Sequence, residues 1–102
     1  MRVIAKSTIK KFWEQAAYRD AKGPLESWHE EAVKAHWESP QAIKNQYRNV
    51  SICSNNRVVF NIGSNKYRLV VEMQYRASIA WIKFVGTHAQ SDSINAETVN
   101  DY

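Results

Sequence analysis

The sequence "RVVFNIGSNKYRLVVEMQY", residues 57–75, has the pattern of a β-hairpin. Two runs rich in Val, Ile, Phe and Tyr flank the four residues "GSNK". Such runs are typical of β-strands, and Gly and Asn accept the positive φ that a tight turn requires. Because the link is short, the two predicted strands must be antiparallel neighbours.

Two further strands are predicted on either side of this hairpin. "VSIC" precedes it across the link "SNN", and "SIAWIKFVGT" follows it across the link "RA". Short links again force antiparallel neighbours, so residues 50–87 are predicted to form a four-stranded meander. The opening "RVIA" is a candidate for a fifth, short strand.

The N-terminal part has helical periodicity instead. Apolar residues recur at helical spacing over 8–19, with Ser7 as a candidate cap, and a second helix is predicted from Pro24 to the "ESP" at 38–40. "AIKNQYRN", residues 42–49, is treated as a connection. The prediction is a single α+β domain over 1–102, with two N-terminal helices packed on one face of a four- to five-stranded, mainly antiparallel sheet.

The composition limits the class of protein. The 102 residues suffice for one modest core, and no apolar run approaches the roughly 18–20 residues of a membrane span. The N-terminus lacks the apolar segment of a signal peptide, and the single cysteine excludes an internal disulfide. These features predict a soluble cytoplasmic protein without a membrane partner.

The positive charge is concentrated in the sheet half of the chain. Residues 44–83 contain seven Lys and Arg residues against one acid, Glu72, whereas residues 84–102 contain three acids and neither Lys nor Arg. Such a concentration favours a polyanionic partner such as nucleic acid. Ordinary solubilising charge on exposed strands is the alternative.

Strand alternation predicts which side chains share a face. Odd-numbered residues from Tyr67 to Tyr75 form the predicted core face, and Ile82 and Phe84 are expected to lie on one face of the last strand, opposite Val85. The opposite, uncovered face of the sheet is then predicted to carry Lys66, Arg68, Arg76, Trp81 and Lys83. Cations beside an aromatic ring bind single-stranded nucleic acid, although charged stems can also merely cover a sheet.

Two motifs, "VVFNIGSNKYRLVV" and "IKFVGTHAQSD", together with "WESPQAIKNQYRNVSI", closely resemble the HigB family within the RelE-like toxins of bacterial toxin–antitoxin pairs. The resemblance runs through most of the chain. It implies a RelE-like fold and a ribosome-dependent endoribonuclease that cuts mRNA in the ribosomal A site. It also implies neutralisation by a HigA-like helix-turn-helix antitoxin.

The resemblance and the residue chemistry together predict the site. Metal-independent cleavage uses the RNA 2′-hydroxyl as nucleophile, so the protein must move protons and hold negative charge. Imidazole gains and loses a proton near neutrality, and guanidinium forks hold phosphate. The predicted catalytic residues are His88, Arg68, Lys66 and Asp92, and the predicted RNA-binding residues are Arg48, Arg57, Arg76, Lys83, Trp81 and Ser91. No metal or nucleotide cofactor is expected, since no residue cluster has the spacing of such a site.

One departure from the family pattern leaves alternatives open. The family histidine is usually followed three residues later by a tyrosine, but "THAQSD" places Ser91 there. Either His88 does the acid–base work with Asp92 orienting it, or the chain is a weakened nuclease. The alternatives are a module that binds RNA or the ribosome without cutting, or a basic face that serves only to hold an acidic antitoxin segment.

Overall fold

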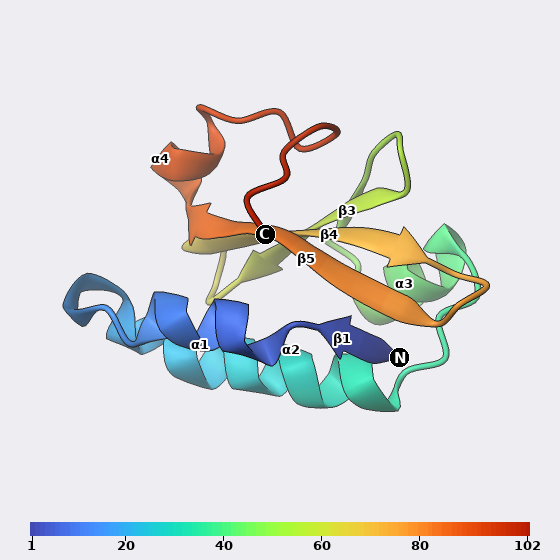
Figure 1. The fold of residues 1–102 in the computed structure, drawn as a ribbon, viewed down its shortest axis with the longest axis horizontal. Coiled ribbons are helices and arrows are strands. Elements are labelled where there is room, and N and C mark those ends of the chain that lie inside the picture. Colours follow the sequence, from blue (N-terminus) through green and yellow to red (C-terminus); the bar gives the residue numbers. More distant parts are fainter.

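The computed structural model describes residues 1–102 as a five-stranded sheet with the first helices of the chain on one face and the last helix and the C-terminal segment on the other (Figure 1). The predicted α+β class is confirmed. The elements are β1 (Arg2–Ile4), α1 (Lys6–Trp13), η1 (Ala16–Ala21, a 3₁₀-helix), α2 (Lys22–Lys34), α3 (Pro40–Gln46), β2 (Ser51–Ile52), β3 (Arg57–Ile62), β4 (Tyr67–Gln74), β5 (Ile79–Thr87) and α4 (His88–Ser91).

The sheet has the strand order β1-β5-β4-β3-β2. Strands β2 to β5 pair antiparallel in sequence order, so the predicted meander is confirmed, and β1 pairs with β5 in parallel. The turn between β3 and β4 has positive φ at Gly63, Ser64 and Asn65. Gly and Asn at such positions reduce the cost of a tight turn, as the hairpin prediction required.

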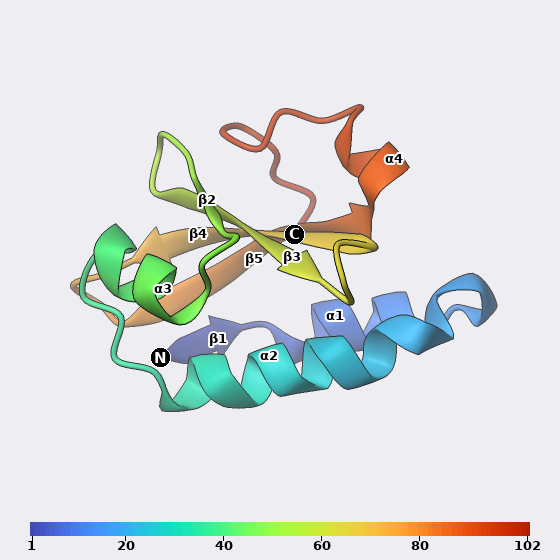
Figure 2. The same ribbon diagram turned by 180° about the vertical axis from the view of Figure 1, so that it is seen from behind.

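The helices α1 and α2 lie side by side beneath the sheet, and α3 lies beside β2 (Figure 2). Their apolar residues join the inner face of the sheet in one core that contains Ile9, Leu25, Trp28, Phe60 and Leu69, all at most 2% exposed. The rings of Trp28 and Phe60 meet edge to face at 5.4 Å. The core therefore lies between the helical layer and β3, β4 and β5.

The helix boundaries differ from the predicted ones. The segment 8–19 is not one helix: α1 ends at Trp13, and η1 contains a kink at Tyr18 (φ −123°, ψ 19°). The predicted second helix starts two residues earlier, at Lys22, and ends at Lys34. Ala35 follows in an extended conformation (φ −74°, ψ 153°) and leads the chain to Trp37, which is 4% exposed.

Helix α3 was not predicted. Its N-cap is Ser39, whose hydroxyl accepts the backbone N–H of Ala42, and Pro40 occupies the first turn. Both residues are ordinary signals for the start of a helix. In the sequence, Pro40 was interpreted only as the end of the second predicted helix.

A bulge in β5 corrects the predicted faces of that strand. Val70 pairs with Phe84 and Val71 with Ile82, so Lys83 is the extra residue between them. The bulge shifts the alternation by one. Phe84 therefore lies on the opposite face from Ile82, and Val85 joins the helical core, contrary to the expectation for both residues.

The face of the sheet opposite the helices is also covered, which the sequence did not predict. Residues 92–102 cross it (Figure 1), and Val59, Val70, Phe84 and Val99 form a second, smaller core beneath them. The expectation of an uncovered basic face is therefore wrong for its central part. None of the helices is long and apolar enough to span a membrane.

Candidate active site

The centre of the candidate site is a contact between Arg68 and His88. Arg68 lies near the start of β4 and His88 is the first residue of α4, directly after β5. The Nε of Arg68 donates a hydrogen bond of 3.3 Å to Nε2 of His88. With Nε2 accepting, the proton of the neutral ring sits on Nδ1, and the terminal N–H groups of the guanidinium have no protein partner. The sequence predicted both residues, and the structure brings them together.

The orientation of His88 comes from a capping box at the start of α4. The hydroxyl of Thr87 accepts the backbone N–H of Gln90 at 3.1 Å, and the Gln90 side chain accepts the Thr87 N–H at 2.8 Å. The reciprocal bonds begin the helix at a defined residue. The Gln90 amide also donates to the hydroxyl of Tyr18 at 3.1 Å, which ties α4 to η1.

Gly86 allows α4 to lie close against the sheet. It pairs with Arg68 in the register of β4 and β5. A Cβ at this position would lie 2.7 Å from both Oε1 of Gln90 and Cζ of Phe84, closer than real Cβ contacts. The absence of a side chain at Gly86 is thus a condition for the position of His88.

We expect Gly86→Ala to lower the free energy of unfolding by about 1–3 kcal/mol, because Phe84 and Gln90 must both move. The displaced capping box should also shift His88 relative to Arg68. Chemical denaturation measures the first effect, and the NMR signals of the His88 ring measure the second. The matched control is Gly23→Ala, where nothing lies within 4 Å of the added Cβ. Equal stability of the two glycine variants would contradict the close packing of Phe84 and Gln90 around Gly86.

Lys66 precedes Arg68 by two residues, but it forms an ion pair with Asp20 on the helical side of the sheet. Asp20, in η1, accepts hydrogen bonds from both the ammonium of Lys66 and the hydroxyl of Tyr67. These bonds, with Lys66 the larger influence, hold the pKa of Asp20 below its ordinary value of 3.8, and the same pair raises the pKa of Lys66. Lys66 therefore turns toward η1 and does not lie on the opposite face of the sheet, where it was expected.

The pKa of Asp20 gives a test of this pair. Because the folded-state pKa is depressed, the carboxylate stabilises the fold above its ordinary pKa, and this stabilisation is lost as the pH falls through the depressed value. Lys66→Met should raise the pKa of Asp20 toward 3.8. A carboxyl ¹³C titration by NMR measures it, with Lys44→Met as the control. An Asp20 pKa that is identical in the wild type and in Lys66→Met would contradict the ion pair.

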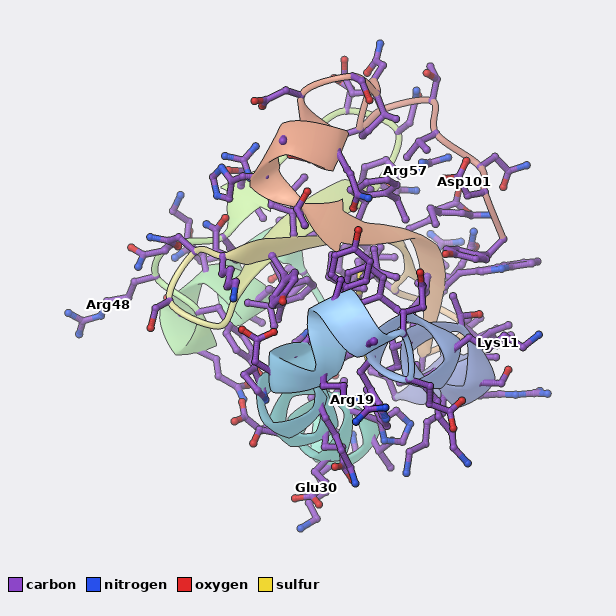
Figure 3. All side chains as sticks on the ribbon, turned by 90° about the vertical axis from the view of Figure 1, so that its left-hand side faces the viewer. Lys11, Arg19, Glu30, Arg48, Arg57 and Asp101 are labelled. Atoms are coloured by element: carbon purple, nitrogen blue, oxygen red, sulfur yellow. The ribbon has the colours of Figure 1, made fainter.

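Three of the predicted RNA-binding residues are buried, and for Lys83 this corrects the expectation that it lies on an uncovered face. Arg57 is 6% exposed, Lys83 is 7% and Ser91 is 8%. Arg57 donates from one terminal nitrogen to the carbonyls of Ala96 at 3.2 Å and Val99 at 2.5 Å, so it lies between the sheet and the C-terminal segment (Figure 3).

Lys83 and Ser91 are occupied in a similar way. The Lys83 ammonium donates to the side-chain oxygen of Asn100 at 2.8 Å and lies 4.2 Å from the ring centroid of Trp81. The Ser91 hydroxyl donates to the His88 carbonyl at 2.8 Å. These buried side chains are engaged within the fold and are not exposed for contacts with RNA.

The remaining predicted residues are exposed but dispersed. Trp81 is 37% exposed and pairs with Glu72 in the sheet. Arg76 follows the far end of β4, which lies roughly 20 Å from Arg68 at about 3.3 Å per residue. Arg48 extends into solvent on another flank (Figure 3). Arg76 and Trp81 therefore do not form one surface with the Arg68–His88 contact, and Arg48 lies at a separate pocket beside the β3 edge.

Asp92 does not orient His88 as one alternative proposed. The chain does turn helically after His88, and the backbone N–H of Asp92 donates to the His88 carbonyl at 3.1 Å. The Asp92 carboxylate is exposed and makes no hydrogen bond or ion pair within the chain. The ring contact of His88 comes from Arg68 instead.

Sequence reasoning missed Gln90, Gly86 and Tyr18 as parts of the site. A signal for Gln90 was present, because "THAQ" has the Thr-x-x-Gln spacing of a capping box. Tyr18 had no such signal, since it reaches α4 only through the kink in η1, where its ring stacks on Phe12 at 4.5 Å. No group of three His, Cys, Asp or Glu side chains is placed to hold a metal ion.

Comparison with known proteins identifies one family. The model of the HigB toxin family, described as the RelE-like toxic component of a toxin–antitoxin system, matches residues 21–94. No curated protein matches the chain. The matched range covers α2, α3, strands β2 to β5 and α4, and so contains both Arg68 and His88.

Proposed function

Because the chain belongs to the HigB family, the RelE-like toxic components of toxin–antitoxin systems, we propose that it is a ribosome-dependent endoribonuclease that cleaves mRNA. The observation that carries this proposal is the hydrogen bond between Arg68 and His88 at the end of the sheet. A fixed cation next to a group that transfers protons is the smallest set of groups that metal-free RNA cleavage requires.

Arg68 binds the phosphate in the proposed reaction. Its Nε is held by His88, so the guanidinium is positioned before substrate arrives and its terminal N–H groups remain for two phosphate oxygens. Charge on those oxygens increases in the transition state, and a preorganised cation stabilises it most there.

His88 accepts the proton of the 2′-hydroxyl. As the phosphate engages the guanidinium, Nε2 of His88 is released to take that proton. The O2′–P bond forms, the P–O5′ bond breaks, and water protonates the departing 5′-oxygen. The products are a 2′,3′-cyclic phosphate on the upstream fragment and a 5′-hydroxyl on the downstream fragment.

The small number of groups supports dependence on the ribosome. The site supplies one imidazole and one guanidinium, while Lys66 is engaged with Asp20. Precise placement of the RNA must come from elsewhere, and the ribosomal A site can provide it.

The proposed inhibitor is a HigA-like helix-turn-helix protein. Membership of the family implies an antitoxin partner. We propose that this antitoxin prevents the Arg68–His88 contact from reaching mRNA on the ribosome.

The test is cleavage of a defined mRNA by purified protein, with and without ribosomes, followed by analysis of the new ends. We expect cuts only with ribosomes, and downstream fragments with 5′-hydroxyls, which require phosphorylation before ligation. Binding to ribosomes without cuts would replace the proposal with a non-cutting RNA- or ribosome-binding module. Downstream fragments with 5′-phosphates would contradict the 2′-hydroxyl mechanism.

A further inference from the structure

A pocket of about 380 Å³ opens between the α3–β2 connection and the β3–β4 turn, and no step of the proposed reaction uses it. Its volume falls within the range of small-ligand pockets, about 300–1,000 Å³. Its lining comes from residues 46–50, from the end of β3, and from the left-handed turn residues Ser64 and Asn65.

The floor of the pocket is apolar and its rim is polar. Tyr47, Val50 and Phe60 form the floor, where the Tyr47 and Phe60 rings pack edge to face at 5.2 Å. The rim carries the exposed amide side chains of Asn49 and Asn65. A flat heteroaromatic ring with hydrogen-bonding groups along its edge suits such a pocket, because amides are both donors and acceptors.

The free edge of β3 adds a backbone donor and a backbone acceptor. The N–H and C=O of Arg57 bond to Ser54 and Cys53, so they point toward β2. Backbone direction repeats every second residue, so the N–H and C=O of Asn61 point the same way. Strand β2 pairs only with Val58 and Val59, and the edge at Asn61 therefore faces the pocket.

The pocket adjoins the proposed cleavage site across a single strand pair. Asn61 pairs directly with Arg68 in the register of β3 and β4. Directly opposed residues carry their side chains on the same face, with Cβ atoms about 4.5–5.5 Å apart, so Asn61 connects the pocket to Arg68, whereas Phe60 in the pocket floor belongs to the helical face. The Asn61 side chain also donates to the Asn49 carbonyl at 2.8 Å, which holds the rim of the pocket in place.

We propose that this pocket binds the base of a nucleotide next to the scissile phosphate and sets the base preference of the cut. The inference rests on the proposed function, since it places an RNA strand across Arg68. The Asn61 edge and the Asn49 and Asn65 amides read the edge of the base, and Arg48 binds the adjoining backbone phosphate.

A peptide strand is a less suitable occupant. The free edge of β3 runs only from Phe60 to Ile62, because β2 closes it on one side and the turn at Gly63 on the other. Strand addition needs a longer row of backbone groups. The amides and Arg48 at the rim also suit a nucleotide better than an apolar side chain.

The first test measures binding without cleavage. The four nucleoside 5′-monophosphates are titrated separately into ¹⁵N-labelled protein, with inorganic phosphate as the reference. We expect at least one nucleotide to shift the Asn61 backbone amide and the Asn49 and Asn65 side-chain signals, whereas phosphate alone does not. Shifts confined to other surfaces, or identical shifts with phosphate, would overturn the inference.

The second test measures base preference with two variants and matched controls. Asn65→Gly removes an amide at a residue with φ +70°, and Asn56→Gly makes the same change at φ +58° in another turn. Asn49→Ala is paired with Asn45→Ala on α3. We expect Asn65→Gly and Asn49→Ala to lower the preference for the favoured base about fivefold or more, and both controls to retain it.

The outcomes of the two tests separate this inference from the proposed function. Ribosome-dependent cutting whose base preference is unchanged in Asn65→Gly and Asn49→Ala would overturn the pocket and leave the nuclease intact. Nucleotide shifts at the pocket in a protein that never cuts mRNA would support nucleotide binding there, but would overturn both the nuclease and the role of the pocket in the base preference of a cut. Shifts produced only by a peptide strand added to β3 would overturn the nucleotide assignment.

Discussion

Arg68→Ala should lower the rate of ribosome-dependent mRNA cleavage by about 10²–10³-fold, because it removes the one cation held beside the proton-transferring group. His88→Ala should lower the rate by about 10²–10⁴-fold through loss of the proton acceptor. Single-turnover cleavage on programmed ribosomes measures both rates. Growth of cells in which each variant is induced should recover in parallel.

The fold should survive both substitutions. Arg68 and His88 are only half-buried, and neither belongs to the hydrophobic core. The control is Arg2→Ala, which removes an exposed arginine from the edge strand β1 and should cleave at the wild-type rate. A conservative variant, Arg68→Lys, should retain the charge but lose the two parallel hydrogen bonds to phosphate, so its cleavage rate should lie between those of Arg68→Ala and the wild type. Well-folded Arg68→Ala and His88→Ala proteins that cleave normally would refute the proposed site.

Arg57→Met should lower the free energy of unfolding by about 2–4 kcal/mol. The guanidinium is 6% exposed and donates to two carbonyls of the C-terminal segment. Its Nε lies 3.6 Å from a carboxylate oxygen of Glu72, close enough for an ion pair but without a hydrogen bond. Methionine fills a similar volume, but it leaves the Val99 carbonyl without its donor and removes the cation beside the Glu72 carboxylate.

The loss should be localised to the C-terminal segment. Hydrogen exchange should accelerate at residues 94–101 and expose the small core around Val99. Urea denaturation measures the global change. Arg48→Met, which alters an exposed arginine, should stay within about 0.5 kcal/mol of the wild type. An Arg57→Met protein as stable as Arg48→Met would mean that Arg57 does not hold the C-terminal segment.

The order of strands β2 to β5 was predictable from local patterns, whereas the parallel pairing of β1 with β5 was not. Apolar runs rich in β-branched residues, separated by links of two to four residues, define a meander because short links allow only antiparallel neighbours. The residue types in "YRLVV" and "GTH" also identified Arg68 and His88, and the structure joins them by a hydrogen bond. Their roles in catalysis remain predictions.

The helices were less predictable, because their ends depend on what they pack against. The apolar spacing of 8–19 continues past Trp13, yet the chain kinks at Tyr18 so that its ring stacks on Phe12 and its hydroxyl meets Gln90. Propensity alone is a weak guide where such tertiary contacts decide the backbone.

The sequence by itself determined the class of fold and the family, and it predicted the two residues at the centre of the candidate site, because each depends on patterns among neighbouring residues. Only the tertiary structure decided which cations face solvent. A bulge at Lys83 reverses the alternation of β5, and the segment that covers Arg57 follows it in the chain by about 40 residues. Charge and strand parity are local properties, whereas burial depends on which distant segment covers a face, and no local pattern encodes that choice.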